Sequence, residues 1–538
     1  MAIKGKHLAS TLVAVALLGL GFVLGIRVQQ KNIEKQFLSL QKWNKINAVL
    51  SYIDREYVDP IDTKKVEENA ITDILQSLDP HSTYIPASNM KAVNEPLDGN
   101  FDGIGVVFNM ATDTVVVINV IVGGPSERAG VLAGDRIVTV NDSVIAGRKI
   151  PQDSVMRLLR GPRKTKVTVG IHRVDEGSLV PITITRGEIP IKSVDVAYML
   201  NDSVGYIKIS TFSRNTYEEF MRAVEKLRTQ NMTRLALDLR GNSGGYLDQS
   251  CSIANEFLKS GDLIVYTQGH GSPRKNYMAD RHGALISTPV AVLIDEGSAS
   301  ASEVLSGAIQ DNDRGSIVGR RSFGKGVVQE PIPFSDGSGM RLTVARYYTP
   351  TGRCIQRPYT SGSYEDYFFE IQRRYEHGEM DVADSIRQAD TLCYTTPKGK
   401  VVYGGGGIMP DVFVPLDTTG VNKYLRMVTR RSLINKFALS FSDQHRAELR
   451  RLTTFDELTK YLDRRNLLQL FHTYATQNGV RGSADDRKAS SSIILAQVKA
   501  LIGRSTPLDD EGFYPFLDSI DNTLQKAVEV LQANNDAP

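Results

Sequence analysis

The hydrophobic and polar positions of this 538-residue chain change their spacing several times and divide it into five stretches. Residues 1–32 contain a continuous apolar run. Residues 33–98 space their apolar side chains as helices do, residues 99–187 form short β-rich runs between glycine turns, and residues 188–415 alternate between strand and helix patterns. Residues 416–538 are charged and helical. At roughly 150 residues per domain, this pattern predicts three or four folded units.

The alternating stretch, residues 188–415, predicts an α/β core, because strands that alternate with amphipathic helices typically form a parallel sheet. In such a sheet, functional groups gather at the carboxyl ends of the strands. The helical tail shows no motif chemistry, so a scaffold, dimerisation or docking role is expected there. The expected strands are 115–122, 136–140, 166–171, 181–185, 204–209, 235–239 and 290–294, and the expected helices are 217–228, 247–258, 301–309, 447–472, 490–502 and 513–531.

Residues 8–26 form an uncharged run of 19 residues that follows Lys4 and Lys6. At about 1.5 Å per residue in a helix, this run just spans the hydrocarbon core of a bilayer. A basic start before an apolar run is typical of a signal anchor or a secretory signal. We favour an uncleaved anchor over a cleaved signal, because no convincing small-x-small cleavage site ends the run. A buried helix of a soluble domain fits less well, since the run has almost no polar face.

Composition narrows the function classes. The chain has 64 Lys and Arg against 61 Asp and Glu, a net charge of +3, so no single-sign field favours nucleic acid as a partner. Its three cysteines, Cys251, Cys354 and Cys393, are far apart and form no CxxC pair, which argues against a disulfide framework and a zinc site and favours small buried side chains. No metal or organic cofactor is expected.

Ser300 lies between a predicted buried strand and a predicted amphipathic helix, in the segment GSASASE. A hydroxyl in the first turn of that helix would stand at the carboxyl end of a central strand. There, the unpaired N–H groups of the helix can stabilise negative charge on a substrate carbonyl. Serine is also a very common helix N-cap, and this segment taken alone fits that structural role better.

Lys325 lies in the segment SFGKGVVQ, between two glycines and before two valines. Burial lowers the pKa of a lysine, and a neutral amine accepts a proton from serine, so Lys325 is a candidate general base. Gln329, four residues later in a predicted strand, faces the same side by the two-residue period and is expected to hold the amine. Most lone lysines are solvated surface charges, but the flanking glycines and valines make this one less typical.

The segment DLRGNSGG, at the carboxyl end of a predicted strand, ends in Gly244 and Gly245. Such a loop presents backbone N–H groups that suit a tetrahedral oxyanion. A phosphate-binding loop is the alternative interpretation. It is disfavoured because the lysine and the serine or threonine of a P-loop are missing after the glycines.

Together, the segments DLRGNSGG, GSASASE, SFGKGVVQ and YTPTGRCIQ resemble the carboxyl-terminal processing peptidases, also called tail-specific proteases. That family pairs a serine with a lysine 25 residues later, as Ser300 and Lys325 are spaced here, and has a glutamine four residues beyond, as at Gln329. The resemblance extends over LDPHSTYIP, FDGIGVVF, AGVLAGDRIVTVND, LLRGPRKTKV and GGGGIMPDVFV. It therefore spans roughly residues 45–415.

The resemblance implies both a fold and a set of roles. The implied fold is an α/β catalytic core of the crotonase/ClpP-like type, with an inserted PDZ domain, an N-terminal helical region and a C-terminal helical extension. The implied site residues are Ser300 as nucleophile, Lys325 as general base, Gln329 as its orienting partner, and the backbone N–H groups of Ala301 and of either Gly244 or Gly245 as the oxyanion hole.

The β-rich stretch resembles a PDZ domain. Its loop Gly103-Ile104-Gly105-Val106 is expected to bind the terminal carboxylate of a peptide through successive backbone N–H groups, while the peptide adds as an extra strand. The later segment AGVLAGDRIVTVND strengthens this resemblance. Arg160 either relays PDZ occupancy to the core, as the gating of the family suggests, or is a plain surface arginine before a turn.

Three other interpretations are weaker. A Ser/His/Asp hydrolase needs a histidine near Ser300, but none of the eight lies next to the catalytic motifs, and His270 and His282 fall in a predicted exposed loop. A non-catalytic PDZ adaptor of the envelope with a peptidase-like core would have no reason to keep the serine, lysine and glutamine set. An acyl-CoA-handling protein of related core topology would have no reason for the PDZ insert.

The sequence thus predicts a serine endopeptidase of the cell envelope that recognises apolar C-terminal tails of proteins through its PDZ domain and cleaves them. An anchor would place it in the inner membrane with the catalytic part in the periplasm, whereas a cleaved signal would leave it soluble there. A homodimer and an activating adaptor or lipoprotein stay open. The predicted domains are the signal anchor at 1–32, the N-terminal helical region at 33–98, the PDZ domain at 99–187, the peptidase core at 188–415 and the helical extension at 416–538.

Overall fold

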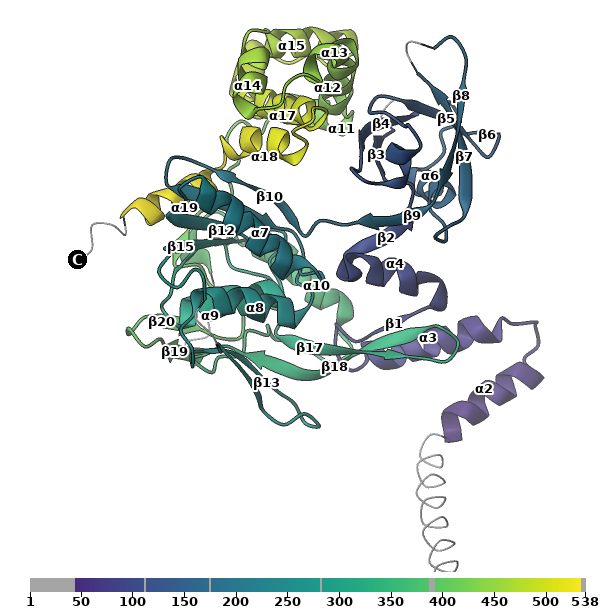
Figure 1. The fold of residues 1–538 in the computed structure, drawn as a ribbon. Helices are drawn as coiled ribbons and strands as arrows, with labels where there is room; N and C mark the ends of the chain where they lie inside the picture. The colour runs from purple at the N-terminus through teal and green to yellow at the C-terminus, as the bar shows by residue number, and fades with distance from the viewer. Residues whose placement is uncertain (1–43, 111–112, 174–175, 281–282, 387–391, 534–538) are drawn as a thin grey trace, which may run out of the picture. The chain divides into compact units, whose positions relative to one another are not determined.

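The chain divides into two compact units, one that ends at Leu78 and one that begins at Asp79. Within the described ranges, no helix is both long and apolar enough to cross a membrane. The apolar run at 8–26 lies outside the residues that the structure describes, so the membrane anchor stays a prediction. The structure is a computed structural model that describes residues 44–110, 113–173, 176–280, 283–386 and 392–533 (Figure 1).

The first unit contains helices α2 (Asn44–Glu56) and α3 (Thr63–Gln76), in the stretch whose apolar spacing predicted helices. Asp62 caps α3, because its side chain accepts a hydrogen bond from Lys65 N at 3.1 Å. Side chains along α2, among them Val49 and Tyr52, are largely exposed.

The β-rich stretch forms a six-stranded antiparallel sheet in the order β3-β4-β5-β7-β8, with β6 paired to β5, so that β3 is an edge strand. Alternate residues of β7, namely Val167, Val169 and Ile171, point into the core of this stretch. Its elements are β2 (Asn100–Gly103), β3 (Val106–Asn109), β4 (Val115–Val120), α5 (Pro125–Arg128), β5 (Arg136–Val140), β6 (Ser143–Val144), α6 (Gln152–Leu159), β7 (Lys166–His172), β8 (Val180–Thr185) and β9 (Gly187–Pro190), and β2 pairs with β9.

The α/β core is built on a six-stranded sheet in the order β10-β11-β12-β15-β16-β21, in which every pair except β10 with β11 is parallel. The predicted strands 204–209 and 290–294 have these bounds. The elements are β10 (Val194–Met199), β11 (Val204–Ile209), α7 (Thr216–Thr229), β12 (Arg234–Asp238), α8 (Leu247–Phe257), β15 (Val290–Ile294), α9 (Ala301–Asp311), β16 (Ser316–Gly319) and β21 (Val412–Phe413).

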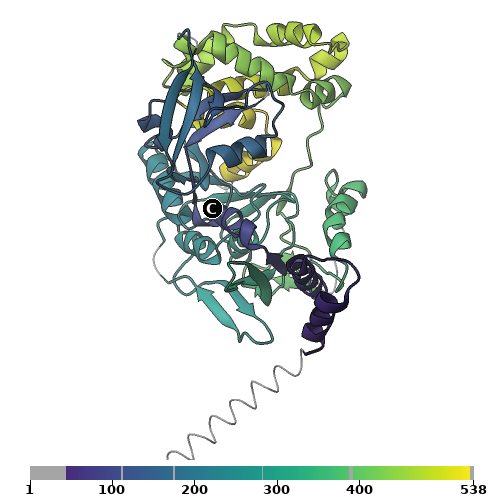
Figure 2. The ribbon, with the colours of Figure 1, turned by 90° about the vertical axis from the view of Figure 1, so that its right-hand side faces the viewer.

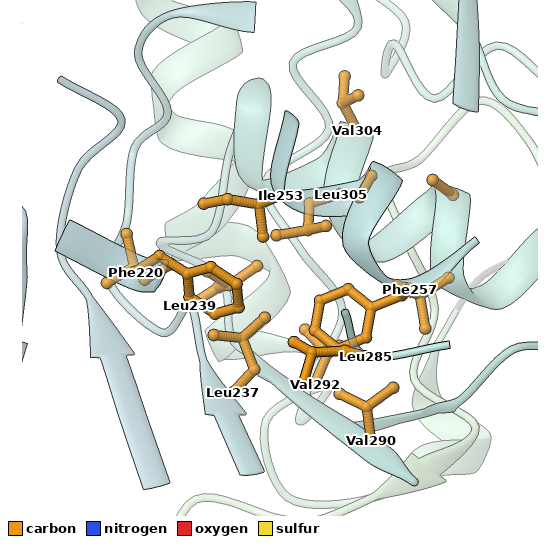
Figure 3. Close-up of a cluster of buried hydrophobic side chains, with 14 of the residues drawn as sticks. Phe220, Leu237, Leu239, Ile253, Phe257, Leu285, Val290, Val292, Val304 and Leu305 are labelled. Atoms are coloured by element: carbon orange, nitrogen blue, oxygen red, sulfur yellow. The ribbon is translucent and has the colours of Figure 1, made fainter. Parts of the chain in front are cut away.

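Both faces of this sheet are covered. The side chains of its buried strands alternate between the two faces, so each strand contributes to both cores. On one face, Val292 packs with Phe257 and with other side chains of α7, α8 and α9 (Figure 3). On the other face, Leu293 packs with Leu531 of α19 (Asn522–Ala533), a helix from the far end of the chain. The carboxyl-terminal stretch is therefore part of the core.

A second, antiparallel sheet has the order β1-β18-β13-β14, with β17 paired to β18. It carries one of the predicted site residues, Gln329, on β17. This sheet and the elements around it are β1 (Thr83–Ile85), α4 (Ala87–Asp98), β13 (Leu263–Gln268), β14 (Lys275–Met278), β17 (Val327–Pro333), β18 (Gly339–Tyr348), α10 (Tyr364–Glu376), η1 (Ala383–Ser385), β19 (Cys393–Thr395) and β20 (Val401–Tyr403).

The helical tail differs from the prediction in two places. The predicted helix 447–472 is three helices, and the predicted helix 513–531 is two, which are separated at residues 519–521. Helices α11 to α17 lie together (Figures 1 and 2), and the hydrophobic core among them also includes Phe516 of α18. They are α11 (Lys423–Arg430), α12 (Leu433–Gln444), α13 (Arg446–Leu449), α14 (Phe455–Asp463), α15 (Leu467–Gln477), α16 (Ala484–Ala489) and α17 (Ser491–Arg504), and α18 (Asp510–Asp518) precedes α19.

The prediction that the cysteines are buried side chains is right for Cys251, which is a residue of α8 and belongs to the hydrophobic core. Cys354 is only partly buried. Cys393 is exposed on β19, so the prediction is wrong for this residue.

Candidate active site

Ser300 is placed at the junction of β15 and α9, where the sequence predicted it. Its backbone adopts φ 56° and ψ −113°, a conformation that is strained for any residue with a side chain. The turn before it is fixed by Ser298, whose hydroxyl donates to Leu239 O at 2.8 Å and accepts from Asp295 N at 3.0 Å. A strained residue that its surroundings hold in place is common at functional sites.

Glu303 is the residue that joins the serine loop to the lysine loop. Its carboxylate is fully buried and accepts hydrogen bonds from Ser300 N at 2.9 Å and from Lys325 N at 2.8 Å, both at the same oxygen, Oε2. Its other oxygen accepts from Ser322 Oγ at 2.5 Å and from Gly324 N at 2.7 Å. The amides of Ser300 and Lys325 therefore lie within two hydrogen-bond lengths of each other.

The burial of Glu303 raises the pKa of its carboxyl above the ordinary value, although the hydrogen bonds oppose this shift. Glu303 is not among the site residues predicted from the sequence. A glutamate three residues after a helix N-cap is typical of a capping box, and this spacing is the sequence pattern that could have identified Glu303.

Lys325 lies just before β17, and its Nζ donates to Gln329 Oε1 at 2.8 Å. The strand begins only at Val327 and has a bulge between Val328 and Gln329, so the two side chains meet through a loop and a bulge rather than through simple alternation. Burial, aided by the charge of Arg341, lowers the pKa of Lys325 below its ordinary value of 10.5. Within the described residues, no hydrogen bond joins Lys325 Nζ to Ser300 Oγ.

His81 lies next to the Lys325–Gln329 pair, a position that was not predicted from the sequence. The side-chain amide of Gln329 donates through Nε2 to His81 O, which turns Oε1 of the same amide toward Lys325. The imidazole itself bonds to Tyr367 Oη at 2.9 Å. Burial, together with the charge of Lys325, lowers the pKa of His81 to about 3, so the ring is neutral at physiological pH.

The turn that carries His81 is fixed by Asp79, whose carboxylate accepts from His81 N and Ser82 N, both at 2.8 Å. Asp79 and His81 belong to the segment LDPHSTYIP, which carried part of the resemblance but suggested no contact with a site residue. Of the two histidines considered from sequence, His270 is exposed, as expected, and His282 lies outside the described residues.

Gly244 lies beside the serine and Gly245 beside Phe212, and their backbone φ angles of +106° and +144° favour glycine. A Cβ on Gly244 would lie 2.8 Å from Ser300 Cβ, and one on Gly245 would lie 2.1 Å from Phe212 O. Gly244 N donates to Asn242 Oδ1 at 2.9 Å. Among the described residues, neither Gly245 N nor Ala301 N has an acceptor, so these two amides are available to a ligand.

The predicted carboxylate loop connects β2 to β3. Gly103 ends β2, Ile104 is buried, and Val106 begins the edge strand β3. Gly105 has φ +78°, and a Cβ there would lie 2.9 Å from the Cδ1 atom of a neighbouring isoleucine, so the turn is restricted to glycine. An edge strand has unpaired backbone groups that another strand can bind.

Arg160, which follows α6, contacts α4 and β2 rather than solvent alone. Its guanidinium pairs with Glu95 at 2.8 Å and lies 4.4 Å from the ring centroid of Phe101. The side chain is still largely exposed. These contacts connect the β-rich stretch to the helix that follows β1.

Family models match three parts of the chain. Residues 203–364 match peptidase family S41, residues 103–187 match a PDZ domain, and residues 424–506 match DUF8443, a family of unknown function. The first match includes Ser300, Lys325 and Gln329.

Curated relatives give the same family. A carboxy-terminal-processing protease of Bartonella bacilliformis is 37% identical over 313 residues, which are 57% of this chain and 71% of the relative. The carboxy-terminal processing protease CtpB of Bacillus subtilis is 34% identical over 58% of this chain and 65% of its own length. A solved structure titled photosystem II D1 C-terminal processing protease has a TM-score of 0.36 and 28% identity, and the likeness covers 69% of this chain and 86% of that one. The chain belongs to the carboxy-terminal-processing proteases of peptidase family S41, and it is a serine-type peptidase with a PDZ domain.

Proposed function

We propose that this peptidase cleaves proteins near their C-terminal tails with Ser300 as nucleophile, Lys325 as general base and Gln329 as the residue that orients the lysine. The observation that carries the proposal is the position of the Glu303 carboxylate, which binds the backbone of both Ser300 and Lys325 through one oxygen. The lowered pKa of Lys325 supports its role, because only the neutral amine accepts a proton.

In the proposed reaction, Ser300 Oγ attacks the scissile carbonyl carbon while Lys325 Nζ takes the hydroxyl proton. The carbonyl oxygen becomes an oxyanion, and we assign the amide nitrogens of Ala301 and Gly245 as its donors, because neither has an acceptor among the described residues. We favour Gly245 over Gly244, whose amide is already bound to Asn242. The lysine ammonium then protonates the departing amine, and the resulting acyl ester is hydrolysed by water that Lys325 deprotonates in turn.

Substrate selection is proposed to rest on the PDZ domain. The backbone amides of the loop Gly103-Ile104-Gly105-Val106 would bind a terminal carboxylate, and β3 is an edge strand to which an extended peptide can add. The chain carries no large net charge, which fits substrates with apolar tails.

The cellular location is a proposal that rests on the sequence. The apolar run 8–26, after two lysines, supports an anchor in the inner membrane with the peptidase in the periplasm, and a cleaved signal with a soluble periplasmic enzyme is the alternative. A homodimer and an activating adaptor or lipoprotein are further partners consistent with an envelope protease.

The test compares Ser300→Ala and Lys325→Ala in the purified full chain, with a folded protein that ends in an apolar tail as substrate. Both variants should lose cleavage, while the exposed-site controls Ser88→Ala and Lys275→Ala should keep it. Retained cleavage by either active-site variant would reject the proposed roles.

A further inference from the structure

Arg240 lies directly before the glycine loop, at the carboxyl end of β12, and its guanidinium is held by two carboxylates. It donates to Asp238 Oδ2 at 2.6 Å and Oδ1 at 3.0 Å, and to Asp521 Oδ1 at 3.0 Å, while its Nη2 lies 2.7 Å from Asp521 Oδ2. Only 17% of the Arg240 side chain is exposed. Charge-assisted bonds of this bidentate kind are short and geometrically specific.

Asp238 is the last residue of β12, the strand that leads into the glycine loop, and its side chain is fully buried. Burial alone would raise its pKa, but the charges of Arg240 and Lys208 outweigh burial and hold the pKa of this carboxyl well below its ordinary value. It also accepts a hydrogen bond from Tyr206 Oη at 2.8 Å. Asp238 is therefore ionised. It binds some of the N–H groups of the Arg240 guanidinium, and the remaining N–H groups can bind a second carboxylate.

The second carboxylate, Asp521, comes from the break between α18 and α19. The sequence predicted one continuous helix there. The break frees the Asp521 side chain to cap α19, because Oδ1 accepts from Leu524 N at 3.0 Å. The buried side chain of Leu524, in the first turn of α19, packs against the sheet that contains β12 and β15, which fixes the position of the N-terminus of the helix.

Hydrogen bonds also hold the residues that lie between Arg240 and the predicted oxyanion donors. Gly241 N donates to Asp295 at 2.8 Å, and the side chain of Asn242 donates to Ile209 O at 3.0 Å. Asn242 O then accepts from Ala299 N at 2.9 Å, in the loop of the nucleophile. Arg240, Gly241, Asn242 and Gly244 are thus each held by at least one hydrogen bond, and the partner of Arg240, Asp521, lies in the C-terminal extension.

We propose that Asp521 is a positioning residue for the peptidase reaction: through Arg240 it fixes the base of the glycine loop, and thereby the Gly245 amide that receives the oxyanion. The inference rests on the proposed function of that amide. Asp521 lies outside the residues matched by the S41 model and by the family of unknown function. The C-terminal segment therefore completes the catalytic apparatus from the opposite face of the sheet.

The first experiment measures kcat and KM for a peptide substrate, and the inhibition constant of a peptide boronic acid, which forms a tetrahedral adduct with a nucleophilic serine. We expect Asp521→Asn to lower kcat about tenfold and to weaken the adduct about tenfold, because a small displacement of an oxyanion donor is costly, while KM changes less than about twofold. Glu529→Gln, which removes an exposed carboxylate from the same helix, should leave all three values unchanged.

A second control separates positioning from stability. Leu531→Ala removes a buried contact of α19 and should lower the melting temperature while leaving kcat unchanged well below that temperature. If Leu531→Ala lowers kcat as much as Asp521→Asn, the role of Asp521 is structural only and the inference fails. Unchanged kcat in Asp521→Asn rejects it as well.

A double-mutant cycle tests the route through Arg240. Arg240→Lys keeps the charge but cannot bind both carboxylates with its fork, and it should lower kcat about tenfold. If Asp521 acts through Arg240, adding Asp521→Asn to Arg240→Lys should lower kcat by less than about a further twofold. Additive losses, about a hundredfold in total, would reject this route, and the cycle with Asp521→Glu in place of Asn decides the question if Asp521→Asn does not fold.

Ser300→Ala serves as the reference in the same assays. An inactive Ser300→Ala together with a fully active Asp521→Asn would refute only this inference. Cleavage by Ser300→Ala would refute the proposed function on which it rests.

Discussion

The carboxylate of Glu303 is fully buried and accepts four hydrogen bonds, and the donors lie in the loops of Ser300 and Lys325. An ionised carboxylate is costly to bury unless such donors satisfy it. The bonds that make the burial of Glu303 tolerable therefore also hold together the loops of Ser300 and Lys325, the proposed nucleophile and base. Folding of this part of the core and assembly of the site depend on the same carboxylate.

Glu303→Gln should reduce both stability and activity. In either orientation, the new NH2 group would face at least one backbone N–H group, that of Gly324 or those of Ser300 and Lys325, and leaving such a buried donor unpaired costs about 1–3 kcal/mol. We expect the melting temperature to fall and kcat to fall by at least about tenfold. Differential scanning calorimetry and peptide cleavage measure the two effects.

The control is Glu376→Gln, an exposed position on α10 that should behave as wild type. An active, equally stable Glu303→Gln would mean that the carboxylate does not hold the two loops.

The protonation state of Lys325 sets the expected pH dependence of catalysis. Only the neutral amine can accept the serine proton, and burial lowers the pKa of Lys325 below 10.5. The value of kcat/KM should therefore rise with pH and level off at a pH below 10.5. Lys325→Arg should be inactive at every pH, because a guanidinium stays protonated.

The measurement is a kcat/KM profile between pH 6 and 10 in the wild type. A profile that falls as pH rises across this range would contradict a lysine base.

At the scale of elements, the PDZ site depends on one turn and one edge strand. The turn between β2 and β3 requires glycine at position 105, and β3 has its outer backbone groups unpaired by any strand of its sheet, within the described residues. Strand position and turn geometry together would orient the amides of the proposed carboxylate loop toward a peptide terminus.

Amidation of the C-terminus of a bound peptide should weaken its affinity by about tenfold or more, because hydrogen bonds to a charged acceptor are lost. Gly105→Ala should bring the affinity of the free acid close to that of the amide. Isothermal titration calorimetry with the acid and amide forms of one apolar-tailed peptide measures both effects.

Gly147→Ala is the matched control for strain alone, since Gly147 has φ +69° and open space around it. Equal affinity for the acid and the amide in the wild type would count against carboxylate recognition.

At the scale of the whole molecule, the C-terminal segment returns to the core and carries a titrating carboxyl into it. Asp518, at the end of α18, accepts from Tyr198 Oη at 2.5 Å. Burial raises the pKa of Asp518 to about 7; the charges of Asp238 and Asp521 add to this shift, whereas the Tyr198 hydrogen bond and Arg240 oppose it. The folded chain therefore keeps this proton up to about pH 7, whereas the unfolded chain loses it near pH 4.

Between pH 4 and 7 the folded state binds more protons at Asp518 than the unfolded state, so this group lowers the free energy of unfolding as pH rises. Asp518→Asn removes the titration and still offers an acceptor to Tyr198. The melting temperature of the variant, relative to wild type, should therefore increase by about 2–4 °C between pH 5 and pH 8.

Melting curves of the wild type and of Asp518→Asn at four pH values test this expectation. A difference between the two proteins that does not change with pH would show that Asp518 titrates in the same range in both states.

Much of this organisation follows from local pattern. The strands at 204–209 and 290–294 were predictable because most of their positions are apolar or aromatic and because serine, proline or aspartate flanks them. Ser300, Lys325 and Gln329 could be named because each stands in a segment with its own signature. The position of His81 beside Gln329 and the break at residues 519–521 could not be predicted, since both depend on contacts between segments that are hundreds of residues apart.

The sequence by itself determined the α/β core, the PDZ-like domain, the family and the names of the proposed catalytic residues, because local periodicity and short motifs carry that information. Only the tertiary structure decided which glycine amide is available beside Ser300, that Glu303 joins the two loops, and that Asp521 reaches Arg240. These facts depend on which buried donors and acceptors find partners. A chain settles that question only when all of its segments are packed together.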